Sequence, residues 1–211
     1  RRDTMNCCLF DIKNVLSDGF EMGNIWYNEP KTLDVAFDVM GDIILSTAAQ
    51  QYGGFTVPEV DKILAPYAEK SYEKYKVEFK QFADPTWPGL DEKAEHYALS
   101  KVRRDFDQGW QGIEYKLNTV GSSRGDYPFV TVTLGLGTKQ FEKMCNISLL
   151  QVHKQGQGKS GNKKPVLFPK IVFLYDEEIH GPGKCCEDVF EEGVDCSSKT
   201  MYPDWLSMSG K

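Results

Sequence analysis

Apolar residues recur at steps of three and four along three long stretches of the chain, which is the pattern of a helix that buries one face. These stretches cover residues 33–48, 58–75 and 91–119. The first ends before the pair Gly53-Gly54, because consecutive glycines disfavour a continuing helix. The second contains Pro66, which removes a backbone hydrogen bond, so we expect a kink or a break there.

Short apolar runs alternate with these stretches and predict buried strands. They cover residues 5–13, 129–134 and 169–175. A fourth helix is predicted from Thr138 to about His153, because threonine is a favoured residue at the start of a helix. The remaining segments 121–126, 156–164 and 176–211 are rich in polar or turn-forming residues and carry no predicted element.

Long helices that alternate with short, wholly apolar strands indicate an α/β fold with buried parallel strands. The chain has 211 residues, of which 40% are hydrophobic, enough for one large core. A parallel barrel needs more than four or five strands, so the sequence predicts one piece of a larger α/β barrel or sheet. Because both ends of the chain are abrupt, we expect it to be a fragment.

Charge and cysteine content narrow the function classes. The net charge of −6 gives no basic footprint for nucleic acid or anionic lipid, and no apolar stretch approaches the ~20 residues that span a bilayer. The six cysteines fit neither a disulfide framework nor a metal-binding spacing, so we interpret them as free thiols of a cytoplasmic protein. The three histidines form no ligand pair, and no metal site is predicted.

Two glycine motifs resemble nucleotide-binding loops but fail on spacing. Gly158-Lys159-Ser160 lacks the earlier glycine of a phosphate-binding loop, since that position is His153. Gly135-Leu136-Gly137 lacks the third glycine of a dinucleotide fingerprint, which would fall at Gln140. We interpret the second motif as a tight turn between a strand and a helix.

Four further residues carry candidate chemistry. Cys7 and Cys8 are adjacent on a predicted strand and therefore point to opposite faces, so one thiol can face a cavity while the other packs in the core. Two buried structural thiols are the alternative. Lys31 lies at the predicted start of a helix, where anions bind, and Lys74 lies on the next helix. Solvated surface lysines are the alternative here.

Ten short segments together resemble the anaerobic (class III) ribonucleoside-triphosphate reductases. They occur in the order of that family and cover nearly the whole chain, which makes the resemblance specific although no single segment is decisive. The segments are NCCLFD at 6–11, GFEMGN at 19–24, QYGG at 51–54, LAPY at 64–67, EYKLNT at 114–119, PFVT at 128–131, LGLGT at 134–138, GQGK at 156–159, LFPK at 167–170 and KTMYPD at 199–204.

The resemblance implies that residues 1–211 are a fragment of a ten-stranded catalytic α/β barrel, with the ATP cone, the finger-loop cysteine and the glycyl radical domain outside this chain. The intact enzyme would reduce ribonucleoside triphosphates by radical chemistry, with formate as reductant and a radical-SAM enzyme as activator. Cys7 matches the redox cysteine of a barrel strand, and Asn6 is a candidate for binding substrate. The fragment alone is expected to be inactive.

The resemblance also implies a homodimer with a specificity site that binds dNTP or ATP effectors. It places this site at Asn28, Lys31, Asp42 and Lys74. A non-catalytic nucleotide-binding or dimerisation module is the main alternative function. A second alternative is another glycyl radical enzyme, such as a relative of formate lyases.

Overall fold

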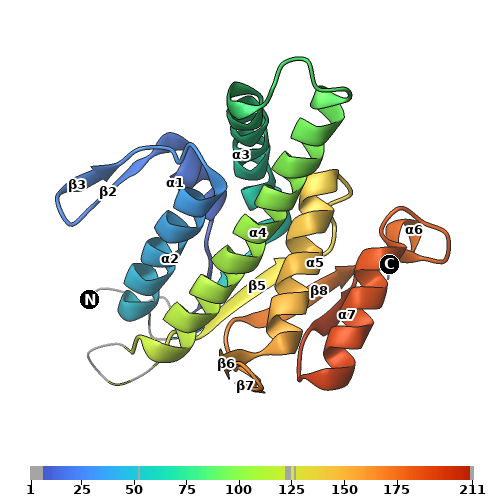
Figure 1. The fold of residues 1–211 in the computed structure, drawn as a ribbon. Helices are drawn as coiled ribbons and strands as arrows, with labels where there is room; N and C mark the ends of the chain where they lie inside the picture. Colours follow the sequence, from blue (N-terminus) through green and yellow to red (C-terminus); the bar gives the residue numbers. More distant parts are fainter. Residues whose placement is uncertain (1–6, 52, 122–124, 126, 210–211) are drawn as a thin grey trace.

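The computed structural model describes residues 7–51, 53–121, 125 and 127–209, and shows a parallel sheet beneath a layer of helices (Figure 1). Every hydrogen-bonded neighbour in the main sheet is parallel. The strands follow their order in the chain: β1 (Cys8–Leu9), β4 (Phe55–Val57), β5 (Val130–Leu134), β8 (Lys170–Tyr175) and β9 (Asp204–Ser207).

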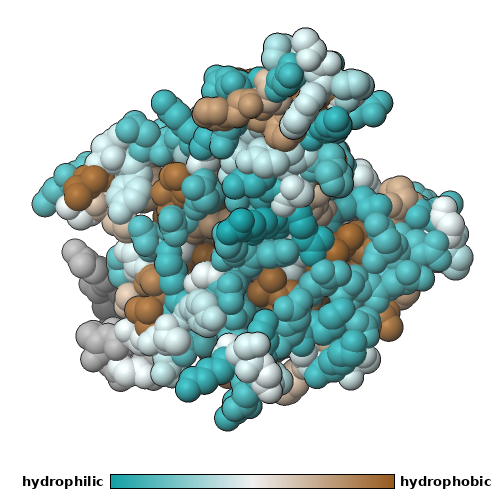
Figure 2. Space-filling model, viewed as in Figure 1, coloured by the Kyte–Doolittle hydropathy of each residue, from teal (hydrophilic) through white to brown (hydrophobic). Residues whose placement is uncertain are grey.

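Sequential parallel order has a direct consequence for the layers. Crossovers between parallel strands share one hand, so strands added in one direction place their helices on the same face of the sheet. Figure 1 shows the long helices in front of the strands, and Figure 2 shows that their outer surface is mainly hydrophilic. The helices are α1 (Ile12–Asp18), α2 (Leu33–Gln50), α3 (Val60–Phe82), α4 (Leu90–Thr119), α5 (Gln140–Gln155), α6 (Glu177–His180) and α7 (Glu187–Lys199).

The two faces of the sheet differ in composition. On β5 the side chains of Val130, Val132 and Leu134 are buried under the helices, whereas Thr131 and Thr133 alternate with them and are only partly buried. The same alternation holds on β4. One face of the sheet is therefore an apolar floor for the helices, and the other face, which we call the open face, carries no helical layer.

The predicted α/β class with a parallel sheet and long helices is confirmed. Of the predicted kink or break at Pro66, the break is wrong, because α3 runs through this residue without interruption. Pro66 lies on the exposed side of the helix. Residues on the buried side before and after it, Ile63 and Tyr67, pack into one core and hold both halves in line.

The first predicted strand is too long. Only Cys8–Leu9 pairs with the sheet, and α1 begins at Ile12 after Asp11, whose carboxylate accepts a hydrogen bond from the Asn14 backbone at 3.3 Å. The N-cap of α5 is Lys139 rather than Thr138. Elements without a prediction are α1, β4, α6, α7, β9 and two hairpins, β2 (Phe20–Met22) with β3 (Ile25–Tyr27) and β6 (Gln157–Lys159) with β7 (Asn162–Lys164).

Two glycines of α4 predict opposite effects of the same substitution. A methyl group at Gly109 would lie closer than 3.0 Å to the ring of Phe37, whereas one at Gly112 would meet open space. We expect Gly109→Ala to lower the free energy of unfolding by about 1–3 kcal/mol through overpacking. Gly112→Ala should raise it by up to about 1 kcal/mol, because alanine is the better helix former. Urea unfolding measures both, and equal effects would contradict the packing of α2 on α4.

Candidate functional site

Cys7 lies at the edge strand of the sheet and is exposed, whereas Cys8 is partly buried against the helix-covered core. The Cys8 amide donates to the Gly54 carbonyl at 3.2 Å, which joins β1 to β4. Cys8 is in register with the buried Phe55, and Leu9 is 78% exposed. The alternation along the strand therefore gives Cys7 and Leu9 the open face and Cys8 the core, which agrees with the sequence interpretation.

The open face near Cys7 combines threonine, aromatic and basic side chains. Leu9 shares a register row with Thr56, Thr131 and Lys170 across four adjacent strands. The Lys170 ammonium lies 5.1 Å from the centre of the Phe129 ring. These groups can bind a polar ligand through hydroxyl and ammonium groups. Asn6, the predicted substrate-binding residue, lies outside the described residues.

The segment that contains Lys31 is held against α3, the helix that carries Lys74, by two contacts. The Leu33 amide in the first turn of α2 donates to the buried Ser71 hydroxyl of α3 at 2.8 Å. Lys70 forms an ion pair with Glu29 at 2.6 Å. These two contacts fasten the segment around Lys31 to the turn of α3 that precedes Lys74.

The amino end of α2 is suited to an anion. Its N-cap, Thr32, makes no side-chain capping hydrogen bond, so the first backbone amides of this 18-residue helix are not capped from there. Lys31, which precedes it, is exposed. The Leu33 amide is bound to Ser71, so the other uncapped amides of the first turn, the positive end of the helix dipole and the nearby Lys31 ammonium favour phosphate, whereas the Asp34 carboxylate of the same turn opposes it.

The other two predicted effector residues lie differently. Asn28 is exposed on the segment that leads into α2. Asp42 lies nine residues beyond Leu33, about 14 Å along the helix. Its carboxylate lies 4.0 Å from the Lys116 ammonium of α4. The contacts of Leu33 and Glu29 thus hold the amino end of α2 against α3, the helix of Lys74, whereas Asp42 lies further along α2 beside Lys116.

Asp61 of α3 is a buried residue that the sequence analysis did not single out. Its carboxylate binds the glycine motif 135–137 that follows β5. Asp61 Oδ2 accepts hydrogen bonds from the Gly137 amide at 2.9 Å and the Gly135 amide at 3.4 Å, and from Asn146 Nδ2 at 3.0 Å. The backbone amides that a dinucleotide fingerprint would offer to phosphate are thus taken by a carboxylate of the protein itself. Burial raises the pKa of Asp61, an effect that these hydrogen bonds oppose.

The remaining motifs have structural roles. Gly158 and Lys159 lie on β6 of an antiparallel hairpin, which differs from the strand–loop–helix of a phosphate-binding loop. His153 is buried and contacts the buried Glu114 at 2.9 Å between Nδ1 and Oε1. His180 Nε2 contacts the Gly135 carbonyl oxygen at 2.9 Å.

The residues that the structure describes contain neither a cluster of metal ligands nor a helix that could span a membrane. Within them, no group of three or more histidine, cysteine, aspartate or glutamate side chains is arranged to hold a metal ion. No helix of that part of the chain combines the length and the apolar character needed to cross a membrane.

Known proteins of one family match this chain over nearly its whole length. The model of the family described as anaerobic ribonucleoside-triphosphate reductase matches residues 2–211. The chain is 38% identical over 206 residues to the anaerobic ribonucleoside-triphosphate reductase of Enterobacteria phage T4, covering 96% of this chain and 32% of that protein. It is 36% identical over 203 residues to the reductase of the same name from Escherichia coli strain K12, covering 96% of this chain and 27% of that protein.

Solved structures give the same fold. The anaerobic ribonucleotide reductase from Thermotoga maritima, described as a complex with dATP and CTP, superposes with a TM-score of 0.65 at 12% sequence identity, covering 99% of this chain and 34% of that one. Another structure of that enzyme, described with dATP bound in the specificity site, superposes with a TM-score of 0.64 at 12% identity and the same coverage.

The chain spans between 27% and 32% of the length of the curated relatives given above. The match to the family extends over nearly every residue of the chain, and it includes Cys7 before β1, Lys31 before α2 and Lys74 on α3. The chain therefore belongs to the anaerobic ribonucleoside-triphosphate reductase family.

Proposed function

We propose that the intact protein reduces ribonucleoside triphosphates to deoxyribonucleoside triphosphates, and that residues 1–211 are a fragment of its catalytic ten-stranded α/β barrel. The observation that carries this proposal is the position of Cys7, which is exposed on the open face of a parallel sheet while Cys8 packs into the core. In such a barrel the open face would line the interior. The family match and the five sequential parallel strands support this reading.

The overall reaction balances with formate as the reductant. The C2′–O bond of the ribose breaks, its oxygen leaves as water, and a C2′–H bond forms. Formate supplies two electrons and leaves as carbon dioxide, and one proton is taken up. A glycyl radical elsewhere in the intact protein would supply the radical chemistry. We assign Cys7 the delivery of thiol hydrogen at the 2′ position, because its S–H bond is weak and its side chain faces the open side.

We further propose that the region of Lys31 and Lys74 is a specificity site for a dNTP or ATP effector. The uncapped amino end of α2 and the two exposed lysines support phosphate binding there. The dATP in the specificity site of the Thermotoga maritima enzyme supports the ligand class. The intact protein would be a cytoplasmic homodimer, activated by a radical-SAM enzyme.

Thermal unfolding tests the placement of this site. Any ligand that binds only the folded chain stabilises it, by about 2.7 kcal/mol when its concentration is a hundred times Kd. The midpoint of thermal unfolding rises as a result. We expect one or more of the four dNTPs or ATP to raise the midpoint of the 211-residue chain. The Lys31→Ala/Lys74→Ala double variant should lose this rise, because two phosphate-binding charges are removed.

A matched control uses two lysines of α3 that already have partners, Lys62 with Glu59 and Lys80 with Asp91. The Lys62→Ala/Lys80→Ala variant should keep the nucleotide-dependent rise. A selective rise that survives in the Lys31/Lys74 variant would refute the placement of the effector site.

A further inference from the structure

The chain contains two pairs of adjacent cysteines, and the fold arranges their thiols in different ways. At β1 the thiol of Cys7 is exposed on the open face, while Cys8 packs against the core. The other pair, Cys185 and Cys186, lies in the turn that leads into α7, and its two Sγ atoms are 3.7 Å apart. An extended strand points neighbouring thiols to opposite faces, whereas this turn brings them into contact.

The two thiols of the second pair differ in access to solvent. Cys185 is exposed and Cys186 is buried, so a reagent from solution meets Cys185 first. The Cys186 thiol donates to the Gly137 carbonyl at 3.6 Å. Burial raises the pKa of Cys186 to about 12, and this group therefore stays a protonated thiol at neutral pH. The pair offers one accessible sulfur and a second sulfur in contact with it.

The peptide group between the two cysteines is held from both sides. The Cys186 amide donates to the Ile179 carbonyl at 2.8 Å, and the Lys143 ammonium donates to the Cys185 carbonyl at 2.6 Å. Lys143 also pairs with Asp188 in the first turn of α7 at 2.8 Å. The separation of the sulfurs is therefore fixed by a bound backbone as well as by the side-chain torsions.

The distance between the sulfurs decides which bonded product fits the pair. A disulfide needs about 2.05 Å, so the two atoms would have to approach by about 1.6 Å across the held peptide group. Two bonds of about 2.3 Å, the length that zinc makes to thiolates, span roughly 3.5–3.8 Å when they meet at an angle of about 100–110°. The same two bonds in a straight line would span about 4.6 Å. The observed 3.7 Å fits one bent thiophilic centre bound to both sulfurs.

The surroundings narrow the kind of centre. Among the residues that the structure describes, no three or more histidine, cysteine, aspartate or glutamate side chains are arranged around one ion. A fitting centre therefore takes two sulfur ligands from the protein and brings its remaining substituent with it. Organic trivalent arsenic meets this requirement, because it keeps one carbon substituent and forms two bent bonds to sulfur.

We propose that Cys185 and Cys186 form a dithiol site that binds trivalent organic arsenicals. With an arsenoxide, R–As=O, the two S–H bonds and the As=O bond break and two As–S bonds form. The oxygen leaves with both thiol protons as water. Arsenic and sulfur keep their oxidation states, so the step needs no oxidant or reductant. Cys185 forms the first As–S bond, and Cys186 closes the ring.

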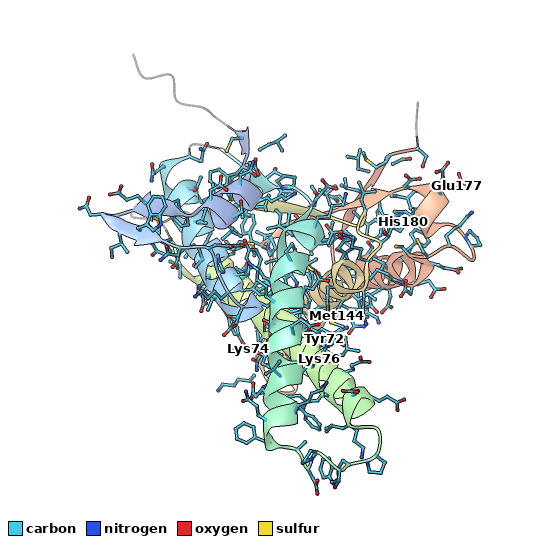
Figure 3. All side chains as sticks on the ribbon, turned by 90° about the horizontal axis from the view of Figure 1, so that it is seen from above. Tyr72, Lys74, Lys76, Met144, Glu177 and His180 are labelled. Atoms are coloured by element: carbon cyan, nitrogen blue, oxygen red, sulfur yellow. The ribbon has the colours of Figure 1, made fainter. Side chains whose placement is uncertain are left out.

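This dithiol site lies apart from the proposed effector site and does not rest on it. Figure 3 shows Glu177 and His180, the ends of α6, well away from Lys74 of α3. The Cys186 amide is bound to Ile179 of α6, which places the pair beside this short helix. Loss of arsenical binding and loss of nucleotide binding are therefore independent observations.

Mass spectrometry of the reduced, folded 211-residue chain with phenylarsine oxide tests the proposal. We expect one adduct per chain that survives excess 2-mercaptoethanol and is removed by 2,3-dimercaptopropanol. A monothiol cannot displace arsenic efficiently from two sulfurs that are held together, because the released sulfur rebinds at a high effective concentration. Cys185→Ser should weaken the apparent affinity for the arsenical at least about a hundredfold. Cys186→Ser should have the same effect.

The first cysteine pair supplies the matched control. Cys8→Ser removes one thiol of that pair and should leave the resistant adduct of the folded chain unchanged. In concentrated urea the fold no longer separates Cys7 from Cys8, so the wild-type chain should carry two resistant adducts. Cys185→Ser and Cys8→Ser should each carry one adduct under these conditions. Circular dichroism without the arsenical checks that each variant folds.

Three results would overturn the proposal. The first is a folded wild-type chain without a resistant adduct. The second is a folded chain with two resistant adducts, because the fold would then not distinguish the pairs. The third is a resistant adduct that persists in folded Cys185→Ser and disappears in folded Cys8→Ser, which would assign the binding to the other pair.

Discussion

Replacing Cys7 by serine is expected to lower nucleotide reduction by the intact reductase at least roughly a thousandfold, while the glycyl radical still forms. Serine has nearly the same shape, but its O–H bond is too strong and its hydroxyl too weakly acidic to replace the thiol. Cys7 is exposed on the open face of the 211-residue chain, so the substitution should change the free energy of unfolding of this chain by less than about 0.5 kcal/mol.

Cys8 is the matched control, because it is the same residue type one position further along the strand. It packs against the core instead of the open face, so Cys8→Ser should cost about 1 kcal/mol of stability and leave turnover of the folded enzyme nearly unchanged. Product formation by chromatography and the radical signal by electron paramagnetic resonance measure the two steps. Full turnover of the Cys7 variant would remove this residue from the mechanism.

Replacing Asp61 by alanine is expected to lower the free energy of unfolding by about 3 kcal/mol, the largest effect on stability that we predict. The carboxylate is fully buried and accepts hydrogen bonds from the amides of Gly135 and Gly137 and from the side chain of Asn146. Alanine would leave all three donors buried without an acceptor. Because the contact ties α3 to the turn before α5, the loss should be cooperative and visible in a single urea transition.

Asparagine at the same position separates hydrogen bonding from charge. Asp61→Asn keeps an acceptor oxygen and removes the buried charge, so we expect it to lose much less stability than Asp61→Ala at pH 7. Burial raises the pKa of Asp61 in the folded chain above its ordinary value of 3.8. The folded state therefore holds this proton more tightly than the unfolded state does.

The sign of the pH dependence follows from that shift. The contribution of Asp61 to stability is fully present below pH 3.8 and is lost as the pH rises through the higher pKa of the folded chain. The stability of the wild type relative to Asp61→Asn should thus fall with rising pH over this window and then become constant. Urea midpoints of the two proteins between pH 3.5 and about 8 measure the difference, and an increase would contradict the direction of the shift.

Much of the fold follows from local patterns. The helix over residues 91–119 was predictable because many turns repeat the same apolar face, and the strands at 129–134 and 169–175 because their runs are apolar and β-branched. The alternation of a strand is equally local, which explains why the opposite environments of Cys7 and Cys8 could be inferred. The ordered series of short motifs indicated the family.

Other features depend on residues far apart in the chain. β4 has three residues, too few for a periodic signal, and it exists because it pairs with β1 and β5 on either side. Packing on both sides of Pro66 overrides the local tendency of proline to end a helix.

The sequence by itself determined the α/β class, the long helices and the family, because each rests on short-range patterns of residue types. Strand alternation indicated only that Cys7 and Cys8 face opposite sides of the sheet. Only the tertiary structure decided that Asp61 fills the glycine turn 74 and 76 residues away, and that the Cys186 thiol contacts the same turn. Such contacts arise where packed helices and strands bring distant side chains together, and no local spacing of residues encodes them.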